Sequence, residues 1–221
     1  MSTLSISEEN YLKAIFHLYT HDAGIGTNAI AHHLNTKAAS VTEMIKKLAE
    51  KKLLTYEKYQ GVVPTRKGFT LALGIVRKHR LWEYFLVEKL KFKWDEVHDI
   101  AEQLEHIKSE RLVEQLDHYL GFPKLDPHGD PIPDKEGKMC AMNCCCVSDI
   151  KPNSNAKISG VKNHSPAFLK HLEKMKLTIG KTVKVIDRND FDQSVELVLN
   201  HETMYISKEV AENLLVKKIK G

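Results

Sequence analysis

The chain has 221 residues, of which 42% are hydrophobic and 28% charged, and a formal net charge of +4. This length allows one or two domains with their own cores, and no apolar run approaches the ~20 residues of a membrane span. The first ten residues lack the basic and apolar regions of a secretory signal, and all four cysteines fall within residues 140–146. We therefore expect a cytoplasmic protein with reduced thiols, neither a membrane protein nor a disulfide scaffold.

Charge is unevenly distributed along the chain. Residues 1–75 carry 9 Lys or Arg against 6 Asp or Glu, residues 76–146 carry 11 against 14, and residues 147–221 carry 13 against 9. The basic first part permits a nucleic-acid partner, although a solvated surface gives the same balance. Several of the 12 histidines lie in the acidic middle part, and this combination suggests a cation site.

Apolar residues at helical spacing predict three helices in the first part of the chain, over residues 10–19, 28–34 and 38–51. Ser7 or Glu8 is the expected cap of the first helix and Thr27 of the second. A turn of about three residues between the second and third helices is typical of a helix-turn-helix. Two β-rich runs around Gly61 then predict a hairpin, which in this position would be a wing.

Helices are next expected from Thr65 as a cap to about residue 90, over residues 93–105 and over residues 109–120. Residues 121–146 contain four of the seven prolines and are expected to form a linker. Beyond it we predict a short helix over residues 166–176 and strands over residues 157–161, 182–187, 194–199 and 203–206. Their lengths suit a small β-barrel.

The third helix is the candidate for reading DNA, because a recognition helix presents its first residues to base edges in the major groove. Lysines farther along it, in the wing and at the start of the next helix, would contact phosphates, which gives affinity without sequence preference. Ordinary lysines on solvated helix faces would give the same pattern. The candidate DNA-binding residues are Thr27, Lys37, Ala39, Ser40, Thr42, Glu43, Lys46, Lys47, Lys58 and Arg66.

Imidazoles and carboxylates recur at helical spacing near residue 100. His98, Glu102, Glu105 and His106 would share one face of a helix, and His79 and Glu83 form a further pair four residues apart. Such ligands suit divalent first-row metal ions, with Mn²⁺ or Fe²⁺ favoured. Surface salt pairing is the alternative for each pair, and the pattern is not the HExxH of zinc hydrolases.

Four segments together carry a resemblance to a known family. The chain resembles the diphtheria-toxin-repressor and manganese-transport-regulator family of metal-dependent repressors, in the long form with an SH3-like C-terminal domain. The matching segments are residues 9–15, residues 77–83, residues 97–106 and the His128–Gly129–Asp130–Pro131–Ile132–Pro133 motif.

The resemblance implies a mainly α fold, with a winged helix-turn-helix, a helical dimerisation domain and a small C-terminal SH3-like β-barrel. The implied domains are residues 1–75 for DNA binding, 76–122 for metal binding and dimerisation, 123–146 as a Pro/Gly/Cys linker and 147–221 as the SH3-like (FeoA-like) domain. The implied partners are a double-stranded DNA operator and a second copy of the chain, with no membrane and no organic substrate. Repression of manganese or iron uptake genes is implied in the same way.

The resemblance also implies two sites per subunit for Mn²⁺ or Fe²⁺. His79, Glu83 and His98 match the ancillary site, and Glu102, Glu105 and His106 match the primary, activating site, with Asn10 at the first-helix position. His164 is the candidate substitute for ligands that the SH3-like domain donates in iron-type members. The metal would fix the DNA-binding domains at a spacing that matches successive major grooves.

Three residues depart from the family pattern in informative ways. Glu102 replaces the cysteine of iron-type members and agrees with manganese regulators. Asn10 is a weaker ligand than the aspartate found there in some members. Lys13 stands where short manganese regulators have a further carboxylate, which argues against a two-metal cluster.

Two other function classes remain as alternatives. A winged-helix regulator controlled by an organic ligand or a protein partner would leave the His/Glu face as ordinary surface. A metallohydrolase is not expected, because no nucleophile or general base stands at a recognisable spacing, so we predict that the chain is not an enzyme. The cysteines Cys140, Cys144, Cys145 and Cys146 are expected to be reduced thiols without a fixed role, with a redox or accessory metal role as the alternative.

Overall fold

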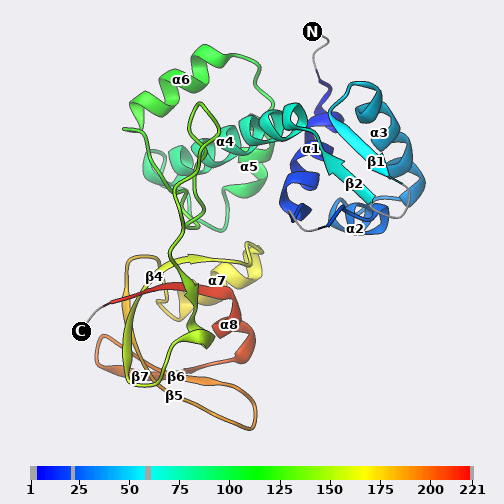
Figure 1. Ribbon diagram of the computed structural model, residues 1–221. Helices are drawn as coiled ribbons and strands as arrows, with labels where there is room; N and C mark the ends of the chain where they lie inside the picture. Colours follow the sequence, from blue (N-terminus) through cyan, green and yellow to red (C-terminus); the bar gives the residue numbers. More distant parts are fainter. Residues whose placement is uncertain (1–3, 21–22, 58–60, 220–221) are drawn as a thin grey trace. The chain divides into compact units, whose positions relative to one another are not determined.

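The computed structural model describes residues 4–20, 23–57 and 61–219 (Figure 1). The chain divides into two units, and the helices α4 (Arg66–Glu88) and α5 (His98–Leu104) each contribute residues to both. The first unit contains residues 1–82, 102–119 and 133–139; the second contains residues 83–101, 120–132 and 140–221. Within the described residues, no helix has both the length and the apolar character needed to cross a membrane.

The predicted helix-turn-helix and hairpin are present in the first unit. Its leading elements are α1 (Ile6–Leu18), α2 (Thr27–His33), α3 (Ala38–Glu50), β1 (Leu54–Glu57) and β2 (Gly61–Pro64). The hydrophobic core beneath them includes Leu12, Ile15, Ile30, Val41, Ile45, Leu48 and Val62. Thr27 is the first residue of α2 and not its cap, which is Gly26 without a side-chain hydrogen bond. The predicted wing residue Lys58 lies outside the described residues.

Helix α1 begins four residues earlier than the apolar pattern predicts. Ser5, and not Ser7 or Glu8, is the cap: its hydroxyl accepts from the Glu8 N–H, and the Glu8 carboxylate accepts from the Ser5 N–H at 2.8 Å. This reciprocal capping box pairs two backbone groups that a helix end otherwise leaves unpaired. The polar residues Ser7, Glu8 and Glu9 thereby become helical although they carry no apolar periodicity.

Glu8 also links stability to pH, because it is buried and Lys51 donates to its carboxylate at 2.5 Å. Burial alone would raise the pKa of Glu8, but hydrogen bonds from Lys51 and Ser5 and the charge of Lys47 lower it to about 2. A lowered pKa stabilises the fold above the unfolded pKa near 4.5, and this stability is lost as pH falls toward 2. We expect Glu8→Gln to reduce the free energy of unfolding at pH 7 by about 2–3 kcal/mol.

Urea unfolding of wild type and Glu8→Gln at two pH values checks this prediction. The difference between the two proteins is expected to narrow by about 1 kcal/mol at pH 4 relative to pH 7, because the wild-type carboxylate loses its advantage in that window. A difference that is constant over this range would contradict the ion-pair argument.

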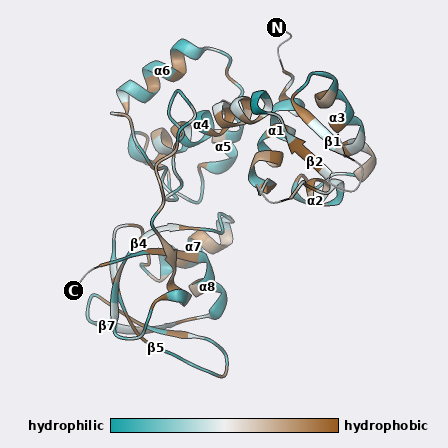
Figure 2. Cartoon of the chain, in the orientation of Figure 1, coloured by the Kyte–Doolittle hydropathy of each residue, from teal (hydrophilic) through white to brown (hydrophobic). Residues whose placement is uncertain are grey.

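The middle of the chain forms α4 (Arg66–Glu88), α5 (His98–Leu104) and α6 (Glu110–Tyr119). Thr65 caps α4 as predicted, with its Oγ1 accepting from the Gly68 N–H at 3.1 Å. The predicted start of α5 at residue 93 is wrong, because Lys93 and Glu96 close a separate turn through a backbone and a side-chain hydrogen bond. Figure 2 shows α6 with alternating hydrophobic and hydrophilic colour, in keeping with its buried Val113 and Leu116.

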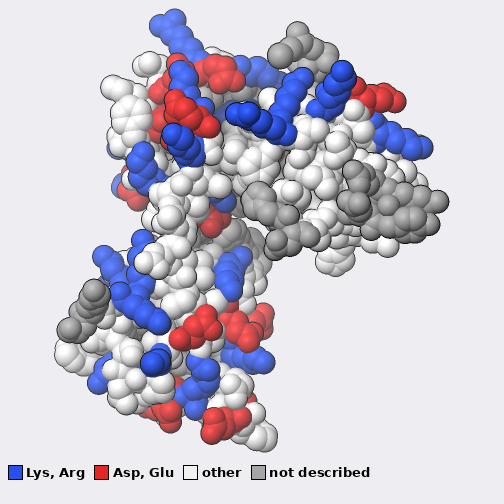
Figure 3. Space-filling model, in the orientation of Figure 1, with Lys and Arg blue, Asp and Glu red and all other residues white. Residues whose placement is uncertain are grey.

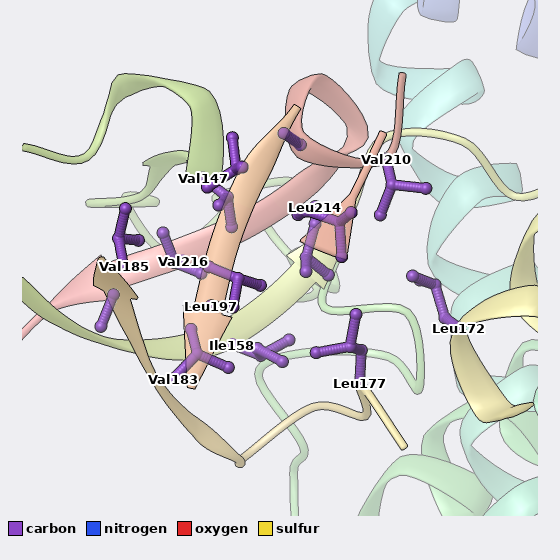
Figure 4. Close-up of a cluster of buried hydrophobic side chains, with 14 of the residues drawn as sticks. Val147, Ile158, Leu172, Leu177, Val183, Val185, Leu197, Val210, Leu214 and Val216 are labelled. Carbon is purple, nitrogen blue, oxygen red and sulfur yellow. The ribbon is translucent and has the colours of Figure 1, made fainter. Parts of the chain in front are cut away.

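A six-stranded antiparallel sheet dominates the second unit, in the order β3-β8-β4-β5-β6-β7. In chain order, the strands and the helices between them are β3 (Cys145–Cys146), the short 3-10 helix η1 (Val147–Asp149), β4 (Ser154–Val161), α7 (Pro166–Lys174), β5 (Thr182–Arg188), β6 (Val195–Leu199), β7 (Glu202–Ile206), α8 (Lys208–Asn213) and β8 (Leu214–Lys218). Figure 4 shows valines, leucines and isoleucines from several strands meeting in its core.

The C-terminal prediction is therefore confirmed in part. All four predicted strands and the predicted helix exist, whereas β3, α8 and β8 were not predicted. No pairing among the described residues joins the edge strands β3 and β7, so the structure shows a six-stranded sheet and does not show its closure into a barrel. The description "mainly α" fits only the part of the chain before this sheet.

Residues 121–132, in the segment predicted as a linker, contain no helix or strand but are partly buried. Asp126, His128 and Ile132 are each less than a tenth exposed. The His128 carbonyl accepts from the Val161 N–H at 3.0 Å, which attaches this loop to β4. Gly129 has φ +92°, and a Cβ there would lie 2.2 Å from the Ser159 carbonyl oxygen. The close approach of two backbones explains why glycine stands at this position.

Candidate metal centres and nucleic-acid interface

A buried carboxylate, Glu105, is the centre of a polar cluster in the first unit. Its Oε2 accepts from the Lys13 Nζ at 2.7 Å and lies 2.6 Å from the His79 Nδ1. Lys13 also donates to the Glu102 Oε1 at 2.5 Å. Donor atoms of His79, Glu102 and Glu105 all lie within 4.8 Å of one another, which is close enough for one cation to contact them together.

His106 is oriented toward the same carboxylate by Glu9, which was not among the predicted site residues. Its Nδ1 lies 2.6 Å from the Glu9 Oε2, and its Nε2 lies 3.9 Å from the Glu105 Oε1. A carboxylate on one ring nitrogen commonly fixes a metal-binding histidine and leaves the other nitrogen for the ion. Glu9 is also an ion-pair partner of Lys108. Its position beside Asn10 on a buried helix is the signal that could have found it.

Two buried oxygens in the first unit test whether these residues fit a cation. Among the described residues, the Glu105 Oε1 and the Asn10 Oδ1 have no hydrogen-bond partner. Burying such atoms without a partner costs free energy, and a bound cation would remove that cost. The donor set of carboxylates, an amide oxygen and imidazole suits Mn²⁺ or Fe²⁺. The residues present therefore fit a divalent ion.

A second carboxylate cluster lies in the second unit around Glu83. The Glu83 Oε1 lies 3.5 Å from the His98 Nδ1, and its Oε2 lies 3.6 Å from the His128 Nδ1. Donor atoms of Glu83, Asp126 and His128 lie within 4.8 Å of one another, and all three residues are buried. Asp126 and His128 were not predicted as ligands. A carboxylate and an imidazole close together in a proline-rich segment, the imidazole within the His128–Gly129–Asp130 motif, were the available signal.

His128 is held in a fixed orientation by backbone groups. Its Nε2 lies 2.7 Å from the Trp94 carbonyl oxygen, which leaves Nδ1 toward Glu83. Burial opposes protonation, but the hydrogen bond and charge of Glu83, with Asp126 and the Trp94 carbonyl, raise the pKa of His128 to about 9. The Asp126 Oδ1 accepts from the backbone N–H groups of His128 and Asp130. These bonds fix both side chains before any ligand binds.

His164, the candidate ligand from the SH3-like domain, lies beside this cluster. Its ring centroid is 5.1 Å from that of His128, and its Nε2 is 3.7 Å from the Asp130 Oδ2. Burial lowers the pKa of His164 against the opposing charge of Asp130. Its Nε2 is buried without a hydrogen-bond partner among the described residues.

The prediction that four metal-ligand candidates share one helical face near residue 100 is wrong in one respect. Helix α5 ends at Leu104, so Glu105 and His106 lie in the turn that follows it. The structure brings His98 to Glu83 in the second unit, whereas Glu102 and Glu105 share Lys13 in the first. The four residues predicted on one face therefore belong to two clusters.

Helix α3 presents the predicted DNA-reading residues to solvent. Val41, Ile45 and Leu48 face the core, and Figure 3 shows Lys and Arg side chains around this helix. The exposed candidates are Lys37, Ala39, Ser40, Thr42, Glu43, Lys46, Lys47 and Arg66, while Thr27 is half-buried. Lys47 lies 3.5 Å from Glu8, so it already has an acidic neighbour.

Comparison with known proteins agrees with this geometry. Three family models match: the iron-dependent repressor N-terminal DNA-binding domain at residues 3–62, its metal-binding and dimerisation domain at residues 65–134, and the FeoA domain at residues 145–218. The HTH-type transcriptional regulator MntR of Oceanobacillus iheyensis is 32% identical over 120 residues, which are 54% of this chain and 81% of MntR. The chain belongs to the iron-dependent repressor family.

Further members of the iron-dependent repressor family show the extent of the likeness. The iron-dependent repressor IdeR of Mycobacterium bovis is 32% identical over 133 residues, which are 60% of this chain and 58% of IdeR. The match thus spans less than two thirds of that relative. A solved manganese-dependent transcriptional repressor in complex with manganese is 30% identical, with a TM-score of 0.85 over 96% of this chain and 100% of that one. These relatives are transcriptional repressors and not enzymes, as predicted.

Proposed function

We propose that the chain is a metal-dependent transcriptional repressor that binds operator DNA as a homodimer when Mn²⁺ or Fe²⁺ is bound. The observation that carries the proposal is the buried Glu105 Oε1, which has no hydrogen-bond partner among the described residues and lies 3.9 Å from the His106 Nε2. A family model for metal binding and dimerisation and a solved relative in complex with manganese support it. An exposed α3 gives the surface that would contact DNA.

Two metal sites per subunit follow from the two clusters. In the first unit, Asn10, Glu102, Glu105 and His106 would hold the ion. His79 would add an imidazole to this first site, next to Glu105. In the second unit, Glu83 and His98 would hold the other ion together with Asp126, His128 and His164. Their oxygens and imidazole nitrogens serve Mn²⁺ and Fe²⁺ alike. We further propose the predicted domain boundaries, a closed SH3-like barrel at the C-terminus and a cytoplasmic location.

The first-unit site would act through α1. Leu12 and Ile15 of α1 belong to the same core as α3, so α1 is fixed to the helix pair. Asn10 on α1 and Glu105 after α5 would hold one ion between them, which supplies a fixed positive charge. Because a ligand shifts an equilibrium only by its differential affinity, this ion must bind the DNA-competent arrangement more tightly than the alternative.

Replacing His106 by alanine is expected to abolish the Mn²⁺-dependent gain in DNA affinity while the dimer persists. His106 offers a nitrogen ligand whose orientation Glu9 fixes, so its loss removes one metal donor and leaves the helix core in place. The check is DNA binding measured with Mn²⁺, Fe²⁺, Co²⁺ and Zn²⁺ under anaerobic conditions, on a fragment selected from random DNA by the Mn²⁺-loaded wild type.

His171→Ala on the exposed face of α7 is the matched control and is expected to respond like wild type. A full metal response of the His106→Ala protein would contradict the proposed site. Equal DNA binding by wild type with and without metal would instead favour a regulator controlled by an organic ligand or a protein partner.

A further inference from the structure

We propose that Lys13 is a tethered cation that occupies the first-unit metal site in the metal-free protein and sets the metal concentration needed to fill it. This inference rests on the proposed function, since it concerns how tightly the same site binds its ion. Lys13 donates hydrogen bonds to both Glu102 and Glu105, two of the residues proposed to hold the ion.

The Lys13 ammonium is built into the cluster and is not a surface neighbour. Its side chain is only 11% exposed, and the Glu105 side chain is fully buried. A lysine ammonium is a compact charge with three donors, of which two are used here at 2.5 and 2.7 Å. Because an unpaired buried charge is costly, the two carboxylates and the ammonium stabilise one another.

A divalent ion would have to compete with Lys13 for the same atoms. The Glu102 and Glu105 oxygens that contact Lys13 come from the residues that cluster with His79 within cation distance. Two positive charges beside one carboxylate repel each other strongly at short range and low dielectric. Metal binding therefore requires that the ammonium leave or that its repulsion be overcome, and either cost weakens the observed metal affinity.

The Glu105 Oε1 shows where an ion would first bind. This oxygen carries no hydrogen bond among the described residues and lies 3.9 Å from the His106 Nε2, whereas Oε2 is already shared by Lys13 and His79. An arriving ion would contact the free oxygen and His106 while Lys13 still holds the other. The response would be an exchange of one cation for another, with α1 attached to Glu105 in both states.

The experiment measures Mn²⁺ affinity by competition with a fluorescent chelator in four proteins: wild type, Lys13→Met, Lys13→Arg and Lys51→Met. Lys13→Met is expected to bind Mn²⁺ at least tenfold more tightly, because it removes the charge and keeps the side-chain length. Lys13→Arg is expected to stay within threefold of wild type. Lys51→Met is the matched control, since it breaks another lysine–glutamate hydrogen bond, from Lys51 at the end of α3 to Glu8 on α1, without touching Glu105.

A second substitution localises the effect and protects the test against misfolding. The tighter Mn²⁺ binding expected for Lys13→Met should disappear when His106→Ala is also present. Lys13→Gln should give the same gain if the Met variant does not fold. Affinity that is unchanged or weaker in Lys13→Met and Lys13→Gln overturns the tethered-cation inference alone. If wild type and every variant fail to bind Mn²⁺, the proposed function fails and the inference with it.

Discussion

Glu105→Ala is expected to lower the free energy of unfolding of the metal-free protein by about 3 kcal/mol, because removing one member of a buried ion pair leaves its partner uncompensated. Lys13 and His79 both lose the buried Glu105 carboxylate in this variant, and Lys13 keeps its hydrogen bond to the partly exposed Glu102. Urea unfolding in the presence of a chelator measures the change. Glu102→Ala is the control: its side chain is 40% exposed, so water can replace it and the expected loss is about 1 kcal/mol or less.

A double variant separates the charge effect from the loss of side-chain volume. Lys13→Met combined with Glu105→Gln removes both charges and keeps similar side-chain sizes. It is expected to recover most of the stability that Glu105→Ala loses, since both charges of the buried Lys13–Glu105 pair are removed together, and Glu102, which is 40% exposed, can be solvated by water. Equal losses in Glu105→Ala and Glu102→Ala would show that burial of Glu105 does not matter for stability.

Gly129→Ala is expected to destabilise the second unit by about 3 kcal/mol or more. The alanine would adopt an unfavourable positive φ and would bring its Cβ to 2.2 Å from the Ser159 carbonyl oxygen and 2.5 Å from the Gly160 Cα. Backbone atoms of β4 cannot rotate away as a flexible side chain can. The preceding residue, His128, would be displaced from Glu83, so metal binding at the second cluster should also weaken.

Gly180→Ala is a matched control in the same unit. Gly180 has the same φ of +92°, but nothing lies within 4 Å of a Cβ built there. Gly180→Ala is therefore expected to lower the free energy of unfolding only by the cost of the positive φ, about 1 kcal/mol. Urea unfolding followed by tryptophan fluorescence compares the two, since Trp94 stacks near His128. If Gly129→Ala and Gly180→Ala lowered the free energy of unfolding by similar amounts, the contact with Ser159 would be relieved at little cost.

Local signals explain what the sequence could predict. The helix pair, the hairpin and the Thr65 cap depend on residues close together in the chain, and the periodicity of Val41, Ile45 and Leu48 identifies the buried face of α3. The family motifs identified Glu105 and His106 directly. The start of α1 was missed because a capping box of Ser5 and Glu8, and not apolar spacing, sets it.

Long-range contacts explain what the sequence could not predict. Lys13 and Glu105 are 92 positions apart, and no local pattern says that an ammonium lies against that carboxylate. Asp126 and His128 lie in a segment whose prolines indicate an irregular loop, but prolines do not show that the loop packs against β4. Strand β8 pairs with β3 and β4, and its short length gave too little alternation to identify it.

The hairpin of the first unit is fastened to the segment before α2. Ile25 and Val62 exchange two backbone hydrogen bonds of 2.9 Å, and a Cβ on Gly61 would lie 2.7 Å from the Ile25 carbonyl oxygen. The wing strand therefore has little freedom to adjust separately from the helix pair. In a DNA-binding protein such stiffness shifts part of the discrimination to the double helix, so that sites whose groove width and bendability already match would be preferred even at base pairs without direct contact.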